Sequence, residues 1–118
     1  MFFAKKRVEI QEGAVLDERY RLAKRIASTF FSDVFEGVQL STKQPVAIKI
    51  LRLDSLPKEE QEPMQARFQR EIGVYARLRH PNLVRLIDTG QVGQNAIYIV
   101  LDFIDMKREN HNRAVMER

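Results

Sequence analysis

The chain has 118 residues and carries 20 Lys and Arg against 16 Asp and Glu, so its formal net charge is +4 with neutral histidines. An apolar fraction of 44% is typical of a globular chain and argues against global disorder. The sequence contains no cysteine, which excludes a disulfide framework and a thiolate metal site, and no apolar run is long enough for a transmembrane segment.

The charge is modest and mixed, and it gives little support for nucleic-acid binding. The densest basic segments are residues 5–7 and 19–25. A basic stripe that binds phosphates would need interleaved aromatic residues or a known reading motif. Residues 1–4 are too short for the apolar part of a secretory signal, and the lysines follow them. We therefore expect a cytoplasmic protein with solvated charged faces and no nucleic-acid partner.

The first half of the chain predicts strands. Residues 1–16 show no strong periodicity and are expected to form an N-terminal arm. Alternating positions then predict strands over residues 20–26 and 33–40. After the turn-forming residues 41–45, residues 46–51 are rich in β-branched side chains and predict a third strand.

A helix is expected next, over residues 63–79. Residues 54–62 are polar and contain a proline, so they are expected to form a loop or a short turn, and Pro63 is acceptable in the first turn of a helix. Apolar residues at three- and four-residue spacing then form one helix face, namely Met64, Phe68, Ile72, Tyr75 and Leu78. Pro81 disfavours helical geometry at the residue before it and ends the helix.

The last third predicts an antiparallel hairpin. Apolar runs at residues 83–87 and 96–103 flank the turn-forming residues 88–95. Residues 106–118 are largely polar and are expected to form a frayed tail or a short exposed helix. The element order and the short connections predict an α+β fold, in which a five-stranded antiparallel sheet packs against one main helix.

Four short motifs occur in a specific order along the chain. They are Val46-Ala47-Ile48-Lys49 in the third expected strand, Glu71 on the helix, His80-Pro81-Asn82-Leu83-Val84 after it, and residues 97–103 in the last strand. In this order they resemble the small, N-terminal lobe of a eukaryotic-like serine/threonine protein kinase, whose V-A-I-K motif is matched letter for letter. The resemblance assigns residues 17–105 to that lobe and implies a chain truncated after the hinge.

The resemblance implies an ATP site in which Lys49 contacts the α- and β-phosphates. Phosphoryl transfer needs charge neutralisation and positioning more than covalent chemistry. A flexible lysine needs an orienting partner, and the resemblance implies that Glu71 is this partner. From the residues alone, Lys49 is also compatible with a surface lysine and Glu71 with a solvated helix residue. Three other acidic residues are alternative partners for Lys49, but they precede the periodic helix. They are Glu59, Glu60 and Glu62.

The same resemblance implies an apolar adenine site. Ile26 and Val34 would cover one face of the base, and the small Ala47 would lie close against it. Leu101 would hold the gatekeeper position. The backbone from Asp102 to Ile104 would offer hinge hydrogen bonds to the base. Without a nucleotide, each of these residues is also compatible with an ordinary core position.

The phosphate-covering loop departs from the family pattern G-x-G-x-x-G-x-V. Aligned on Val34, the degenerate loop has no glycine and consists of Ala27, Ser28, Thr29, Phe30, Phe31 and Ser32. Glycine lets backbone amides approach phosphates, often at positive φ, and the β-branched Thr29 would be the most strained replacement. Hydroxyl groups can still donate hydrogen bonds, and Phe31 can fold under the loop tip. We expect ATP binding to be weak or lost.

No residue can be assigned as general base. The H-R-D-x-x-x-x-N and D-F-G motifs of the family are absent, because Asp102-Phe103-Ile104 ends in isoleucine and His80 is followed by Pro81-Asn82. Binding of Mg²⁺ is therefore expected only if a large lobe is supplied. The chain alone is expected to be inactive.

Two functions remain open on the sequence. In the first, the chain retains part of the ATP-binding lobe of an enzyme that transfers phosphate from ATP to protein Ser or Thr. In the second, it is a non-catalytic, pseudokinase-like interaction or regulatory module. A large kinase lobe or another protein would then cover an exposed inter-lobe surface near Leu101, Phe103 and Tyr75.

Overall fold

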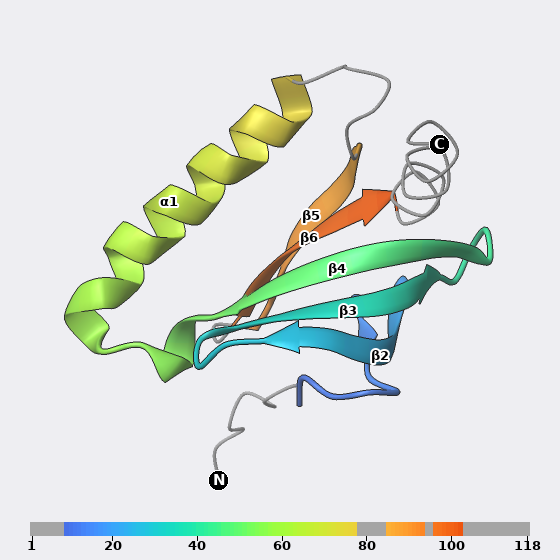
Figure 1. The fold of residues 1–118 in the computed structure, drawn as a ribbon, viewed down its shortest axis with the longest axis horizontal. Helices are drawn as coiled ribbons and strands as arrows, with labels where there is room; N and C mark the ends of the chain where they lie inside the picture. Colours follow the sequence, from blue (N-terminus) through green and yellow to red (C-terminus); the bar gives the residue numbers. More distant parts are fainter. Residues whose placement is uncertain (1–8, 78–84, 94–95, 103–118) are drawn as a thin grey trace, which may run out of the picture.

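The structure is a computed structural model that describes residues 9–77, 85–93 and 96–102. Its elements in chain order are β1 (Val15–Leu16), β2 (Tyr20–Ser28), β3 (Ser32–Gln39), β4 (Gln44–Arg52), the 3-10 turn η1 (Leu53–Ser55), α1 (Lys58–Arg77), β5 (Leu86–Val92) and β6 (Ala96–Asp102). Figure 1 shows a twisted sheet with α1 running beside it. Within the described residues, no helix is both long and apolar enough to cross a membrane.

The strands form one antiparallel sheet in the order β1-β2-β3-β4-β6-β5. The expected α+β architecture is confirmed, with six strands in place of the expected five. The additional strand arises because Val15 pairs with Arg21 and Leu16 pairs with Tyr20. A strand of two residues is too short to show an alternating pattern, so its pairing partner alone reveals it.

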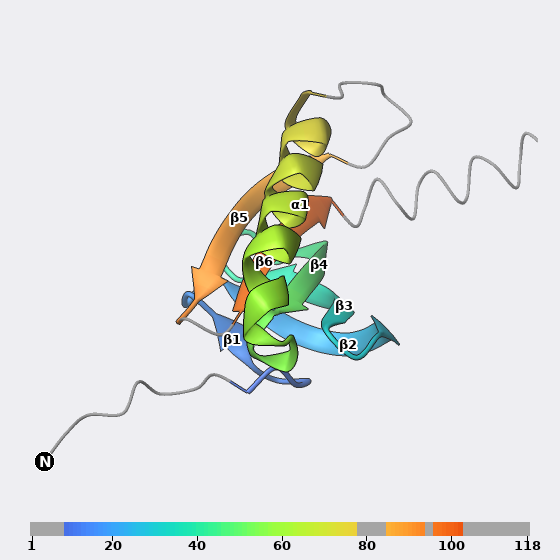
Figure 2. The same ribbon diagram turned by 90° about the vertical axis from the view of Figure 1, so that its left-hand side faces the viewer.

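Two apolar clusters lie on the two faces of the sheet. One contains fully buried residues such as Leu22, Phe35 and Ile48, and Ile10 and Ala14 pack against it. The other is covered by α1 and consists of Ala47, Leu51, Leu53, Phe68, Ile97, Ile99 and Leu101. In Figure 2, α1 lies in front of the strands. The second cluster therefore joins the helix to β4 and β6.

The expected helix start at Pro63 is wrong, because α1 begins at Lys58 and Pro63 lies inside it. The first turn carries Glu59 and Glu60, and acidic residues there are stabilised by the partial positive charge of a helix N-terminus. The side chain of Gln61 also donates to the carbonyl of residue 56 at 3.0 Å. These turns are largely exposed and polar, so they lack the apolar periodicity that marks the rest of the helix. Residues 78 and 79 lie outside the described part of the chain.

The expected hairpin is antiparallel, but its first strand lies later in the chain than the sequence indicates. The turn-forming segment at residues 88–95 contributes most of β5, which pairs with β6 through Val92 and Ala96. Gly90 lies opposite Tyr98, and a Cβ at residue 90 would collide with the tyrosine ring. Glycine here serves close packing in a strand instead of a turn. Residues 83 and 84 are not among those described.

Candidate functional site

The first feature of the site is an ion pair between the sheet and the helix. Lys49 lies in β4 opposite Val34 of β3, on the sheet face that α1 covers. Its Nζ is 2.8 Å from Oε1 of Glu71. The two side chains are 34% and 32% exposed, so the pair is only partly screened by water. This contact holds the ammonium group at a defined place and ties it to the position of α1.

The other acids of the helix do not compete for this lysine. Glu59, Glu60 and Glu62 are exposed in the first turns of α1. Among the ion pairs of the described residues, Lys49 is joined to Glu71 and to none of these three. Of the acids that the sequence left open as partners of Lys49, the structure therefore pairs Glu71 with it.

A pocket of about 230 Å³ opens beside the ion pair, between the sheet, the β2–β3 loop and α1. Its lining residues are Phe31, Ser32, Lys49, Leu51, Met64, Arg67, Phe68 and Glu71. Leu51 and Phe68 belong to the apolar cluster under the helix, and they form an apolar part of the wall. The charged lining combines two cations and one acid, which suits a small anion.

The β2–β3 loop is closed by hydroxyl groups. Thr29 Oγ1 accepts the backbone N–H groups of Phe31 at 3.3 Å and Ser32 at 3.0 Å, and it shares a 2.8 Å hydrogen bond with the Ser32 hydroxyl. The Thr29 N–H donates in turn to the Ser32 carbonyl at 2.7 Å. Positive φ within the described residues is confined to positions 13, 17, 18, 43 and 93, none of which is in this loop. The backbone conformation that would strain Thr29 is therefore not used.

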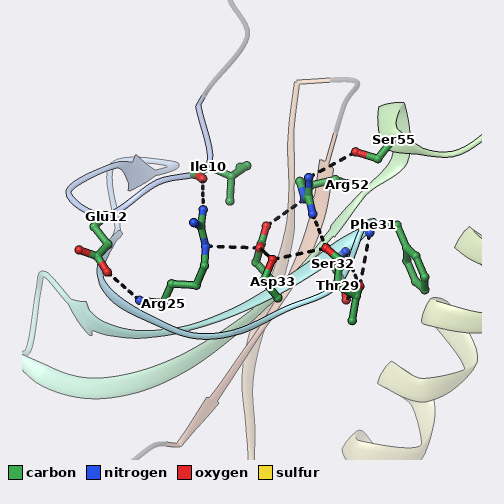
Figure 3. Close-up of polar contacts among 10 residues, drawn as sticks. Ile10, Glu12, Arg25, Thr29, Phe31, Ser32, Asp33, Arg52 and Ser55 are labelled. Atoms are coloured by element: carbon green, nitrogen blue, oxygen red, sulfur yellow. Dashed lines mark hydrogen bonds and ion pairs between the residues drawn. The ribbon is translucent and has the colours of Figure 1, made fainter.

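Asp33 lies directly behind this loop and is only 2% exposed, the one charged residue buried to this degree in the described part of the chain. Its carboxylate accepts a hydrogen bond from the Ser28 hydroxyl at 2.7 Å. It also pairs with Arg52 Nε at 2.9 Å and with Arg25 Nε at 3.4 Å (Figure 3). A buried carboxylate needs such partners, since its desolvation is costly.

Arg52 extends this network to the loop itself. Its Nη2 donates to the Thr29 carbonyl at 2.7 Å, and its backbone N–H donates to the Phe31 carbonyl at 2.7 Å (Figure 3). The alternating pattern marks Asp33 only as a polar strand position, and it assigns no role to Arg52. One available signal is that Asp33 and Phe35 are two residues apart and therefore share a strand face.

Three of the expected adenine-site residues lie on the same sheet face as Lys49. Val34 is opposite Lys49 across β3 and β4, and Ala47 is opposite Leu101 across β4 and β6. Ala47 and Leu101 are buried, and Val34 is partly buried. Cross-strand partners share a face, so these side chains form one apolar surface next to the ion pair.

The remaining expected residues are placed differently. Ile26 lies at a register shift of β2, has no cross-strand partner there, and is 43% exposed. The backbone N–H of Asp102 already donates to the Arg85 carbonyl at 2.9 Å. Phe103 and Ile104 lie outside the described residues, as does the side chain of Tyr75. Leu101, named as a surface candidate, is 8% exposed within the cluster under α1.

Across residues 9–77, 85–93 and 96–102, no group of three His, Asp or Glu side chains lies close enough together to hold a metal ion. The pocket beside Lys49 contains one carboxylate, that of Glu71.

In the described part of the chain, a curled antiparallel sheet, one α-helix and a lysine held by a helical glutamate have the arrangement of the N-terminal lobe of a protein kinase. The comparisons agree, because the family model described as the protein kinase domain matches residues 20–117. The chain belongs to the protein kinase domain family.

Several similar proteins are named as serine/threonine-protein kinases. The chain is 34% identical over 94 residues to serine/threonine-protein kinase pkn2 of Myxococcus xanthus, covering 80% of this chain and 11% of that protein. It is 37% identical over 97 residues to the probable serine/threonine-protein kinase PknB of Lactococcus lactis, covering 81% and 15%. It is 30% identical over 95 residues to CBL-interacting serine/threonine-protein kinase 16 of Arabidopsis thaliana, covering 80% and 20%. The chain thus spans a fifth or less of the length of these relatives.

Proposed function

We propose that this chain supplies the nucleotide-binding lobe of a serine/threonine protein kinase, an enzyme that transfers phosphate from ATP to protein Ser or Thr. The observation that carries the proposal is the 2.8 Å contact between Lys49 Nζ and Glu71 Oε1 beside a pocket. An ammonium group held in this way offers a positioned positive charge to the α- and β-phosphates of ATP. The apolar surface of Val34, Ala47 and Leu101 would receive the adenine ring.

The geometry of the loop supports weak ATP binding. Phosphate-binding loops present free backbone N–H groups to the phosphates. Here the N–H groups of Phe31 and Ser32 already donate to Thr29 Oγ1. An incoming phosphate would have to replace these hydrogen bonds, and part of its binding free energy would be lost in doing so.

Turnover would require a large kinase lobe. The 118 residues contain neither H-R-D nor D-F-G, the motifs that carry the base and the metal ligands. Mg²⁺ neutralises charge on the phosphates when it is bound, and its ligands would come from that lobe. A cytoplasmic location remains part of the proposal.

The proposal predicts that ATP binding depends on Lys49. Titration calorimetry with ATP should give weak binding to the unaltered chain, and Lys49→Met should weaken it at least roughly tenfold, since charged hydrogen bonds to phosphate are lost. The same substitution should lower the free energy of unfolding by only about 1 kcal/mol or less, because the ion pair is a third exposed.

Lys58→Met is the matched control, because Lys58 is an exposed helix residue that does not line the pocket. Its ATP affinity should equal that of the unaltered chain. Absence of ATP binding at millimolar nucleotide, or equal affinity in both variants, would reject the nucleotide site. In a phosphate-transfer assay with generic protein substrates, signal above a Lys49→Ala control would contradict the proposed need for a large lobe.

A second candidate function is a non-catalytic interaction module, possible because several large apolar side chains are exposed. Phe30 at the loop tip is 68% exposed, and Ile26, Val74 and Ile87 are also exposed. Exposed apolar side chains can contribute to contacts with a protein partner, and a large kinase lobe is one such partner. Size-exclusion chromatography with light scattering tests this second function, since a monodisperse monomer at high concentration would argue against an exposed interaction surface.

A further inference from the structure

A second cation lies in the pocket beside Lys49. Arg67 lines this pocket together with Ser32, and it precedes Glu71 by one helical turn, on the same side of α1. Its side chain is exposed. Within the described residues, none of the ion pairs or side-chain hydrogen bonds involves Arg67. Its guanidinium group therefore keeps its donors available to a ligand.

The charge balance of the pocket favours an anion. Glu71 is in contact with Lys49 at 2.8 Å and offsets its charge. Arg67 then leaves the lining with one uncompensated positive charge. A planar guanidinium group can donate two parallel hydrogen bonds to phosphate oxygens, which a lysine cannot do.

The loop next to the pocket makes such a donor useful. The two backbone N–H groups at its tip, those of Phe31 and Ser32, are occupied by Thr29 Oγ1. We infer that Arg67 binds the phosphate tail of the nucleotide from the helix side, and so takes over part of the work that a glycine-rich loop does with backbone amides. This inference rests on the proposed function, and it names an oligophosphate, either free or attached to adenosine, as the group that Arg67 contacts.

The experiment compares two arginines of the same helix. Arg67→Gln removes the pocket cation, and Arg70→Gln removes an equal charge from an exposed residue that does not line the pocket. Each 118-residue variant is titrated with ATP, with tripolyphosphate and with adenosine. Arg67→Gln should weaken ATP and tripolyphosphate about tenfold and leave adenosine unchanged, whereas Arg70→Gln should change none of them more than about twofold.

The three ligands separate the failure of this inference from that of the proposed function. If ATP binds the unaltered chain and the two variants behave alike, the role of Arg67 is rejected and the nucleotide site stands. If tripolyphosphate binds in an Arg67-dependent way and ATP does not bind, the role of Arg67 holds and the nucleotide site is rejected. If neither ligand binds the unaltered chain, both are rejected.

A second variant guards against an effect on folding. Arg67→Lys retains the charge and loses the paired donors, so its affinity for tripolyphosphate should lie between those of the unaltered chain and Arg67→Gln. Circular dichroism should give the same melting temperature for all variants, because exposed substitutions of this kind have small effects on stability. A lysine variant as weak as the glutamine variant at unchanged stability supports the paired geometry, and one that binds as tightly as arginine contradicts it.

Discussion

At the level of single residues, the most constrained charge is that of Asp33. Its side chain is 3% exposed and lies between Arg25 and Arg52, with the Ser28 hydroxyl as a further donor. Burial of a lone carboxylate would cost several kcal/mol, and the surrounding donors offset this cost. Because Arg52 also holds two carbonyls of the loop, the same carboxylate fixes the place of the loop above the pocket.

Asp33→Asn should therefore be strongly destabilising. Asp33 is buried and its partners Arg25 and Arg52 are 42% and 27% exposed, so loss of the carboxylate charge should cost about 2 kcal/mol. Urea unfolding of the variant should show this loss. Glu62→Gln is the control, because Glu62 is exposed on α1 and its substitution should cost less than about 0.5 kcal/mol. Equal effects of the two substitutions would mean that the buried pair contributes no stability.

At the level of elements, the β2–β3 loop shows how serine and threonine close a turn without glycine. Thr29 accepts hydrogen bonds from two N–H groups in the next three residues. A hydroxyl oxygen can replace a backbone carbonyl in this role, as in other turns that use serine or threonine. The loop thus keeps ordinary negative φ angles and gives up free amides.

Thr29→Val should open this loop while it preserves the shape of the side chain. The N–H groups of Phe31 and Ser32 lose their acceptor, so their amide hydrogens should exchange faster, and the free energy of unfolding should fall by about 1 kcal/mol. Hydrogen exchange followed by NMR measures the exchange rates of both amide hydrogens. Thr29→Ser retains the hydroxyl and should exchange like the unaltered chain. Unchanged exchange in the valine variant would show that the hydroxyl does not hold the turn.

At the level of the whole molecule, side chains join the two ends of the curled sheet. The Tyr20 hydroxyl in β2 donates to Asp88 of β5 at 2.6 Å, and Arg19 pairs with the same carboxylate at 3.1 Å. The Tyr98 hydroxyl in β6 donates to Asp17, beside β1. These strands lie far apart in the order of the sheet, so the contacts depend on its curvature.

These contacts predict a loss of stability at alkaline pH. Burial, with the hydrogen bond to Asp88 as the next cause, raises the pKa of Tyr20 from 10.0 to about 12. Burial and the hydrogen bond to Asp17 also raise the pKa of Tyr98. The protonated tyrosines favour the folded state, so their contribution is complete below the unfolded pKa near 10 and is lost as the pH rises through about 12.

The substitution Tyr20→Phe tests how much the Tyr20 hydroxyl contributes to this loss of stability at alkaline pH. At neutral pH the variant should be less stable by about 1 kcal/mol, because a buried hydrogen bond to a carboxylate is lost. At about pH 11 the unaltered chain should lose roughly 1.4 kcal/mol relative to the variant, so that the difference vanishes or slightly reverses, because its unfolded state then gives up the tyrosine proton and the phenylalanine has none. Urea unfolding at the two pH values measures both differences. A difference that is equal at both would contradict the raised pKa.

Much of the fold is determined by the sequence alone. Alternation and β-branched residues locate β2, β3 and β4, and the spacing from Met64 to Ile72 locates most of α1, because each pattern reflects a half-buried face. The ion pair between Lys49 and Glu71 was implied by the family resemblance, whereas the residues alone left it open. The start of α1, the position of β5 and the short β1 were not predicted, since exposed polar turns and two-residue strands carry no periodicity.

The tertiary structure decided which polar residues act together. Asp33 and Arg52 come from different strands, and Asp88 meets Tyr20 from 68 positions along the chain. Arg67 becomes a candidate binding residue only because α1 brings it to the same pocket as Lys49. A polar residue has the same local pattern whether it faces water or a buried partner. The curvature of the sheet and the packing of the helix determine which of the two it meets.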